Sequence, residues 1–140
     1  MSSDAIDAAV VAKLSSDSTL TSLAPGGVYR DVAPAGVSGV YLIVSQMAHQ
    51  DAYVLAGGPA REMVTFLVKA VELAKSGAGA NAAAARVQAL LNGAVLSISG
   101  YRCMNVERSE RIAYAELADG GDARYQHRGG LYEVMAEVIA

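Results

Sequence analysis

The sequence predicts a single α+β domain over residues 1–140, on three observations. Apolar residues recur at helical spacing near the start of the chain and again in an alanine-rich stretch over residues 81–91. Short apolar runs with strand-like alternation lie between and after these helical segments. At 140 residues the chain is also long enough to bury a core without disulfide bonds. We therefore expect one hydrophobic core formed by helices and a sheet.

Two helical segments open the chain. Ser2 or Ser3 can cap the first, because a serine hydroxyl accepts a hydrogen bond from a free backbone N–H of the first turn. A short helical turn around Leu20 and Leu23 follows, and Pro25 with the next two glycines ends it. The apolar face of the first helix consists of Ile6, Ala9, Val10 and Leu14.

Two strands are predicted next, at residues 28–31 and 40–48, with a loop around Pro34 and Gly36 between them. The second strand carries apolar residues at both of its alternating sets of positions. Such a pattern is typical of a strand inside a sheet that is covered on both faces. We expect residues 50–59 to form a loop.

The run REMVTFLVKAVELAK, residues 61–75, fits a helix and a strand equally well. We interpret it as a strand, partly because of the resemblance described below. Residues 76–80 are expected to be a flexible link, after which Asn81 can cap a helix that runs to Leu91. Gly93 suits the left-handed position that follows a helix end. Residues 95–99 and 101–108 are predicted to be strands.

The last part of the chain, residues 110–138, is predicted to be a long β-hairpin that turns at residues 119–122. We expect residues 116–128 to project beyond the core sheet and to contribute little to folding of the monomer. If the turn is centred on two glycines, the cross-strand pairs are Val106 with Met135, Arg108 with Glu133 and Tyr114 with His127.

The composition excludes several classes of protein. A net charge of −3 and a pI near 5.3 do not indicate a nucleic-acid surface. Cys103 is the single cysteine, so an internal disulfide and a cysteine-cluster metal site are excluded. Residues 32–50 are uncharged, but Pro34 and several glycines and serines interrupt them too often for a membrane helix. Because the N-terminus also lacks the basic region of a signal peptide, we expect a soluble, reduced, intracellular protein.

The charge content is low for a small soluble chain. Charged residues make up 18% of the sequence and hydrophobic residues 53%. This ratio favours a surface that is partly covered by a partner. Alanines on solvated helices would give the same ratio without any partner, and both interpretations stay open.

No motif in the sequence predicts catalysis. GAGANA, residues 77–82, has the outline of a dinucleotide fingerprint, but the next strand ends in serine where an acidic residue is required. Cys103 and His127 could be drawn as a nucleophilic pair, yet Cys103 lies in an apolar strand pattern that is typical of a buried, inert thiol. We expect no enzyme activity, no cofactor and no metal site.

Arginines gather late in the chain, at positions 102, 108, 111, 124 and 128, with carboxylates interleaved among them. Mixed signs at this density suit cross-strand ion pairs or a polar interface better than a phosphate-binding track. A solvated hairpin face and a charged subunit interface are the two interpretations left open.

Four stretches of the sequence, taken with the order of the elements, form a distinctive set: GGVYRDVAPAGVSGVYLIV at 26–44, VTFLVKAVELAKSGAGANAAAARVQALL at 64–91, GYRCMNVERSERIAYAELADGG at 100–121 and the Tyr-Gln-His-x-Gly-Gly-x-Tyr motif at 125–132. In these stretches the chain resembles the tail-terminator (tail-completion) proteins of long, non-contractile-tailed bacteriophages. It departs from them at Gly39 and Val40, where many relatives have proline before the tyrosine of the second strand.

The resemblance implies a mixed, mostly antiparallel sheet with two main helices packed on one face and a C-terminal β-hairpin. It implies a non-enzymatic subunit of a ring, commonly of six copies, that caps the finished tail tube and stops its polymerisation. The implied partners are further copies of the chain, the tail-tube protein and the head–tail connector or stopper. No membrane and no specific nucleic acid are implied, since the genome would only pass through the ring. The implied location is the virion neck, and the host cytoplasm during assembly.

We expect the outer part of the hairpin to be the assembly interface. One alternative function is another neck component, either a head–tail connector or a tail-tube subunit. A less favoured alternative is a small ligand-binding α/β domain that uses residues 77–82. The expected interface residues are Arg108, Arg111, Tyr114, Glu116, Arg124, Tyr125, His127 and Arg128.

Overall fold

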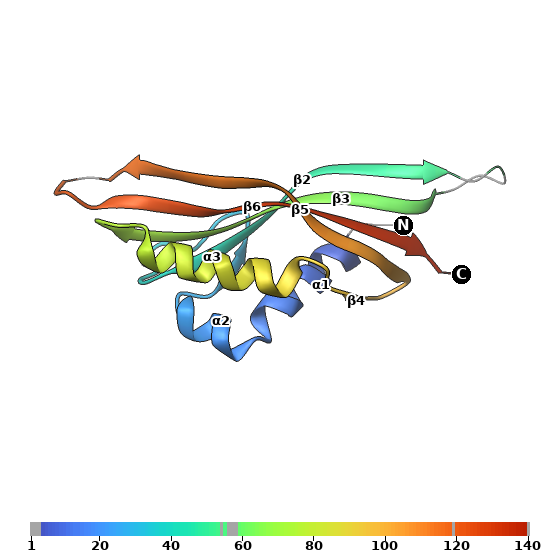
Figure 1. Ribbon diagram of the computed structural model, residues 1–140, viewed down its shortest axis with the longest axis horizontal. Coiled ribbons are helices and arrows are strands. Elements are labelled where there is room, and N and C mark those ends of the chain that lie inside the picture. The colour runs from blue at the N-terminus through green and yellow to red at the C-terminus, as the bar shows by residue number, and fades with distance from the viewer. Residues whose placement is uncertain (1–3, 54, 56–58, 119, 140) are drawn as a thin grey trace.

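The computed structural model describes residues 4–53, 55, 59–118 and 120–139, and it shows a long twisted sheet with helices against one face (Figure 1). The helices are α1 (Asp4–Ser15), α2 (Ser18–Leu23) and α3 (Ala78–Leu91). The strands are β1 (Val28–Arg30), β2 (Tyr41–Tyr53), β3 (Pro59–Ala74), β4 (Ser97–Ile98), β5 (Tyr101–Leu117) and β6 (Arg124–Val138). Their order across the sheet is β1-β2-β3-β6-β5-β4, and of the described pairs only β1–β2 is parallel. The predicted mixed, mostly antiparallel sheet with a C-terminal hairpin is confirmed.

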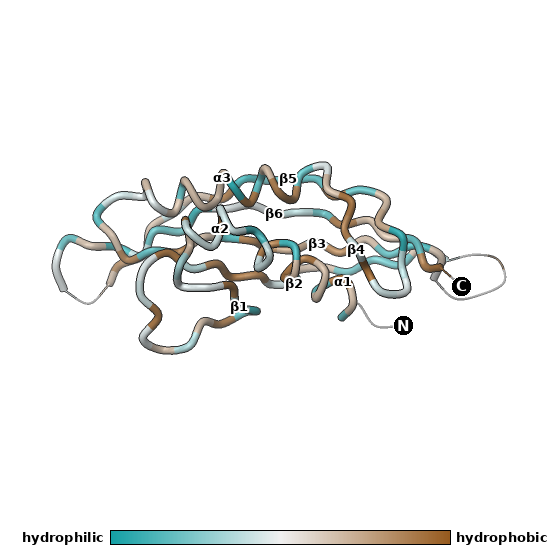
Figure 2. Tube along the Cα trace, turned by 90° about the horizontal axis from the view of Figure 1, so that it is seen from below, coloured by the Kyte–Doolittle hydropathy of each residue, from teal (hydrophilic) through white to brown (hydrophobic). Residues whose placement is uncertain are grey.

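All three helices lie on the same side of the sheet, and Figure 2 looks onto that side. The core lies between the two layers, where Phe66 of β3 and Tyr132 of β6 are among the largest fully buried side chains. The Tyr132 hydroxyl donates a hydrogen bond to Gln88 Oε1 of α3 over 2.8 Å, so the polar end of this buried ring has a partner. The predicted apolar face of α1 is confirmed, since its residues Ile6, Ala9, Val10 and Leu14 are all buried.

The helices are also tied together by an ion pair. Asp17 caps α2 by accepting a hydrogen bond from the backbone N–H of Leu20 over 2.8 Å. Its carboxylate also accepts two hydrogen bonds from the Arg86 guanidinium of α3, over 2.8 and 2.9 Å. The Arg86 hydrogen bond and the Leu20 N–H lower the pKa of Asp17 to about 2. A single carboxylate thereby fixes the start of α2 against α3.

The β2–β3 pair is longer than the sequence predicts. Of residues 50–59, which were expected to be a loop, 50–53 continue β2 and Pro59 begins β3, while 54 and 56–58 lie outside the described residues. Gln50, Asp51 and Ala52 pair with the start of β3 even though their side chains are polar or small. Backbone pairing does not require apolar side chains where a sheet is open to water. The polar side chains of this segment therefore led to a predicted end of β2 that is too early.

The predicted covering of β2 on both faces is confirmed for its first part, where the helices cover one face and the loop 31–39 covers Ile43 on the other, whereas Met47 further along is 58% exposed. The predicted link needs correction. Residues 76–80 are not a flexible link, because α3 already starts at Ala78 and Gly77 is its N-cap. Asn81 is therefore inside the helix, where its N–H donates to the Gly77 carbonyl over 2.8 Å. Gly93 follows the helix at φ +78°, as predicted.

The hairpin register is right at the tip and wrong nearer the core. Tyr114 pairs with His127 as predicted, but Arg108 pairs with Tyr132 and Val106 with Val134. The cause is an irregularity between Arg108 and Glu110, which inserts one residue into β5 and shifts the inner pairs by one position. Within β4 and β5, the strand predicted at 95–99 shortens to Ser97–Ile98, and the one at 101–108 extends to Leu117.

The outer hairpin is not the free two-stranded ribbon that the sequence predicts. β6 pairs with β3 along the whole stretch from Arg124 to Glu137, so a third strand supports the hairpin. Gln126 and His127 are buried as a result, at 5% and 6% exposure. The expectation that residues 116–128 contribute little to monomer folding is therefore wrong for β6.

Gly129 and Gly130 allow β6 to lie close to both of its neighbours. A Cβ on Gly129 would overlap the Val68 carbonyl oxygen and lie 2.6 Å from Lys69 Cα of β3. A Cβ on Gly130 would lie 2.6 Å from the Glu110 carbonyl oxygen of β5, beside the irregularity in that strand. The two glycines of the Tyr-Gln-His-x-Gly-Gly-x-Tyr motif thus have a packing role at the centre of the sheet.

Candidate assembly surfaces

The face of the sheet opposite the helices carries an aromatic and cationic cluster. The Tyr114 and His127 rings stack with centroids 4.3 Å apart and an interplanar angle of 8°. Lys69 Nζ donates to the Tyr114 hydroxyl over 3.1 Å and lies 5.6 Å from the centroid of the same ring. His127 Nε2 contacts a carboxylate oxygen of Glu116. Cross-strand contacts therefore hold this cluster in one arrangement before any partner binds.

His127 titrates below its ordinary range in this cluster. Burial lowers the pKa of His127, and the nearby Lys69 charge lowers it further, while Glu116 acts in the opposite direction. The neutral imidazole is consequently favoured in the folded chain. Because His127 is buried and Tyr114 is 43% exposed, the tyrosine ring is the part of this stack that faces solvent.

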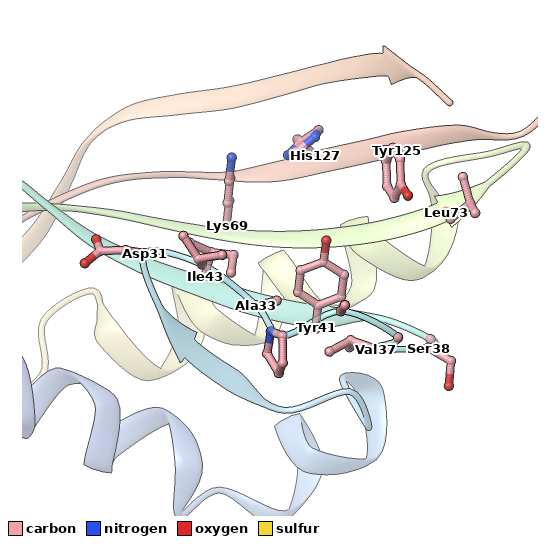
Figure 3. Close-up of a pocket in the computed structure, with 15 residues that line it drawn as sticks. Asp31, Ala33, Val37, Ser38, Tyr41, Ile43, Lys69, Leu73, Tyr125 and His127 are labelled. Carbon is pink, nitrogen blue, oxygen red and sulfur yellow. The ribbon is translucent and has the colours of Figure 1, made fainter. Parts of the chain in front are cut away.

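A hollow of about 600 Å³ adjoins this cluster, between the loop 31–39 and the open face of the sheet (Figure 3). Tyr41 and Ile43 of β2, Leu73 of β3 and Tyr125 of β6 line it together with residues of the loop. Leu73 is 51% and Tyr125 38% exposed, so apolar and aromatic surface faces solvent here. Exposed surface of this kind is typical of a site that another protein covers.

The sheet divides the predicted interface residues between its two faces. Tyr114, His127 and Tyr125 belong to the open face, whereas Arg108, Arg111 and Arg128 line a cavity of about 220 Å³ against α3. The Arg128 guanidinium donates to the backbone carbonyls of Tyr114 and His127 and to Gln126 Oε1, over 2.9 to 3.2 Å. Alternation along β6 explains this separation, because neighbouring residues of a strand point to opposite faces.

Two predicted residues lie nearer the hairpin tip. Glu116 pairs with Tyr125 across the hairpin and carries the carboxylate that contacts His127. Arg124 begins β6, and its guanidinium donates to the Ala123 carbonyl over 3.3 Å. The eight predicted residues thus come from one end of the sheet but do not form one continuous patch.

The glycines of the GAGANA string are packed against charged side chains. A Cβ on Gly77 would overlap the Arg128 guanidinium, and one on Gly79 would lie 2.6 Å from a Glu72 carboxylate oxygen. Space for these side chains, and not chain flexibility, explains both glycines.

Cys103 and His127 are far apart. Cys103 pairs with Ala136 of β6, so the two positions are separated by the length of β6 between His127 and Ala136, about 30 Å at the usual rise of a strand. Cys103 is buried and its Sγ lies 3.8 Å from the Ala94 carbonyl oxygen. The buried, inert thiol predicted from the sequence agrees with this position.

The opposite end of the sheet holds a charged cluster that the sequence analysis missed. His49 Nε2 lies 2.7 Å from Glu62 Oε1 and 3.2 Å from Asp51 Oδ1. Glu62 is 1% exposed, and one ligand atom of each residue lies within 4.8 Å of the other two. Burial, followed by the hydrogen bond to Glu62, raises the pKa of Tyr101 to about 12.

The chemistry of this cluster is charge neutralisation. A buried carboxylate is costly unless it is paired, and either a proton on His49 or a divalent cation held by the three side chains would neutralise it. Asp51 and Glu62 are direct cross-strand partners, so the register of β2 on β3 creates the cluster. His49 and Asp51 are close in sequence, but nothing in the run 61–75 marks Glu62 as buried.

The helices are short, and none in the described part of the chain is apolar and long enough to cross a bilayer. The described surface instead combines an uncovered sheet face with charged clusters at both ends. Together they define a protein whose described surface is suited to contacts with other proteins.

Comparison with known proteins identifies the family to which the chain belongs. Residues 8–135 match the family model of tail completion protein gp17, and the chain belongs to that family. It is thus a structural protein of phage tails, as the resemblance in its sequence implies. Among curated proteins, none matches the chain significantly.

Two solved structures show the same fold. A chain from the virion of a native gene transfer agent particle is 29% identical, with a TM-score of 0.73 and 96% of both chains covered. A second solved structure is 22% identical, with a TM-score of 0.60. The match covers 100% of this chain and 98% of the other chain.

Proposed function

We propose that this chain is the subunit of a ring, of six copies, that closes the head-proximal end of a phage tail tube. The ring stops further addition of tube subunits and presents its other face to the head-side connector. Its work is done by surfaces and not by catalysis, and its place is the neck of the virion, after assembly in the host cytoplasm. The family match and the likeness to a chain of a gene transfer agent virion support this proposal.

The observation that carries the proposal is the uncovered face of the sheet. Helices bury one side of β3, whereas Leu73 of the same strand and Tyr125 of β6 expose apolar and aromatic surface on the other side. Apolar and aromatic surface gathered on one face is typical of a site that a partner covers in the assembled state. Stacking of several flat surfaces around the end of a tube would cover it.

The experiment is complementation of tail assembly in particles that lack this chain. Without it we expect tubes of uncontrolled length that do not join heads, and with the wild-type chain we expect tails of uniform length joined to heads. Tail tubes of normal length in its absence would contradict the proposal.

The same experiment separates this function from that of another neck component. A tail-tube subunit would be required for any tube to form, and a connector would be required only for joining finished tails to heads. Added to growing tubes in vitro, the purified chain should stop elongation. Elongation of the tube by the purified chain itself would assign it to the tube instead.

A further inference from the structure

Two stretches of strand edge have no neighbouring strand in the described part of the chain. β1 covers β2 only opposite Leu42–Val44, and β4 covers β5 only opposite Tyr101 and Arg102. Beyond these pairs, residues 48–53 of β2 and 109–117 of β5 form open edges. They lie on opposite edges of the sheet and at opposite ends of the molecule (Figure 1).

Both open edges lack lysine and proline, two residues that often prevent an edge strand from pairing with another chain. The charges that they do carry are of both signs: Asp51 on β2, and Glu110, Arg111 and Glu116 on β5. Unpaired N–H and C=O groups at such an edge can add a further strand. Each copy of this chain therefore offers two places for strand addition.

The hydrogen bonds of the backbone show which residues of β2 point outward. The Leu42 N–H donates to the Gly27 carbonyl over 2.9 Å, and the Val44 carbonyl accepts from the Asp31 N–H over 3.0 Å, so even-numbered residues face the edge here. An irregularity between Gln46 and Ala48 shifts this phase by one residue. In the open part of β2, the backbone groups of His49 and Asp51 consequently point outward.

The same reasoning applies to β5. The Val106 carbonyl accepts from the Gly93 N–H over 2.7 Å, and the Arg108 N–H donates to Asn92 Oδ1 over 3.0 Å, so both point outward. The irregularity before Glu110 again shifts the phase by one. The outward backbone groups of the open part are therefore those of Arg111, Ala113 and Ala115.

The residues whose backbone groups point to the open edge carry their side chains on the same face of the sheet in both strands. Asp51 is opposite the buried Glu62 and clusters with it, and Arg111 lines the cavity against α3, so both belong to the helical face. β2 and β5 are also antiparallel to each other, because three antiparallel steps separate them in the sheet. If β5 of one copy adds to β2 of another, the joined sheet keeps its helices on one face and both copies have the same orientation.

We propose that β5 of each copy adds as an antiparallel strand to β2 of the next copy, with Arg111 opposite Asp51 and Ala113 opposite His49. This inference rests on the proposed function, since it names how the copies of the ring contact one another. The contact joins two different surfaces, and such a head-to-tail contact closes into a ring when the rotation between copies allows it.

The distribution of charge favours this register, and it favours a second copy of the chain as the partner of the open edge of β2. Arg108, Arg111 and Arg128 gather at the β5 end on the helical face, and Asp51 and Glu62 gather at the β2 end on the same face. Arg111 has no ion-pair partner among the described residues. Opposite charges directly across a pair of strands are favourable, whereas a β5–β5 contact would bring the arginine-rich ends of two copies together.

The first test removes a single outward N–H. Ala113→Pro eliminates this donor without affecting a hydrogen bond to β6, while Ala113→Val at the same position keeps the N–H. We expect Ala113→Pro to lower ring formation at least tenfold, by native mass spectrometry and negative-stain images of tails, and Ala113→Val to assemble normally. Rings of wild-type abundance with Ala113→Pro would overturn the inference.

The second test exchanges the charges across the contact. Arg111→Asp alone and Asp51→Arg alone should weaken ring formation, and the double variant should restore most of it. Thermal unfolding of each isolated variant identifies a simple folding defect. Failure of a folded double variant to recover assembly would contradict the register.

The third test fixes the contact covalently in a Cys103→Ser background. In the proposed register Gln50 lies opposite Ile112, at a distance that suits a disulfide. Gln50→Cys mixed with Ile112→Cys should give cross-linked dimers, neither variant alone should, and the double variant should give a ladder of multiples of 14.4 kDa. If rings form but these cross-links do not, the proposed edge contact is wrong while the proposed ring stands. If the wild-type chain is monomeric within tails, both proposals are wrong.

Discussion

The two faces of β3 lie in different environments, and the proposed function gives each face a different role. Val64, Phe66 and Val68 point to the helical layer and are at most 1% exposed. Lys69 and Leu73, at odd-numbered positions of the same strand, lie on the open face with the aromatic cluster. Because side chains alternate along a strand, successive residues of β3 face the helices and the open side in turn. Changes on the helical face should therefore reduce stability, and changes on the open face should reduce assembly.

The largest effect is expected from the helical face. Phe66→Ala removes a ring that is 1% exposed and leaves a cavity between β3 and the helices. We expect a loss of about 3–5 kcal/mol in the free energy of unfolding, measured by chemical denaturation. A loss below about 1 kcal/mol would mean that this face is not the core.

A similarly large effect is expected where β6 approaches β3. Gly129→Ala places a methyl group against the Val68 carbonyl, and we expect a cost of about 3 kcal/mol or more. Gly36→Ala is the control, because Gly36 has φ +84° and open space around its missing side chain. The control should cost only about 1–2 kcal/mol, from backbone conformation alone. Equal costs for the two variants would contradict the close approach.

The open face should respond in the opposite way. The double variant Leu73→Ser, Tyr125→Ser removes side chains that are 51% and 38% exposed, so we expect a smaller loss in the unfolding free energy than for Phe66→Ala, about 1–2 kcal/mol. Tail termination in the complementation assay should nevertheless fall severalfold. Normal termination by this variant would show that the surface is not covered in the virion.

The smallest effect is a dependence on pH that centres on His127. Because burial lowers its pKa, the unfolded chain takes up this proton before the folded chain does. Stability should therefore be highest above about pH 6.5, the ordinary pKa of histidine, and should fall as the pH drops toward the lower pKa of the folded chain. His127→Gln should remove part of this slope in denaturation curves recorded at several pH values. A slope unchanged by the substitution would place the titrating group elsewhere.

The sequence predicts the elements of this fold better than their registration. The apolar spacing of α1 and the two glycines at the hairpin tip are local signals, and both give correct results. The insertion at Ser109 carries no such signal, because it is a feature of how β5 pairs with β6 across the sheet. Pairs near the tip are consequently right, and those nearer the core are wrong by one residue.

The site shows the same limit. The predicted interface residues lie close together in the sequence and were treated as one patch, although strand alternation alone places Arg128 and His127 on opposite faces of the sheet. Glu62 was missed because its burial depends on packing beside β2 and Tyr101, far from it in sequence. Surfaces that arise from distant strands become visible only when the register is known.

Imaging the head-proximal end of assembled tails tests the central claim most directly, together with the native mass of the particle released from it. The proposed function predicts a closed ring of this chain at that end, with a mass that is a whole multiple of 14.4 kDa. A chain that is a monomer both in solution and within the assembled tail would contradict it.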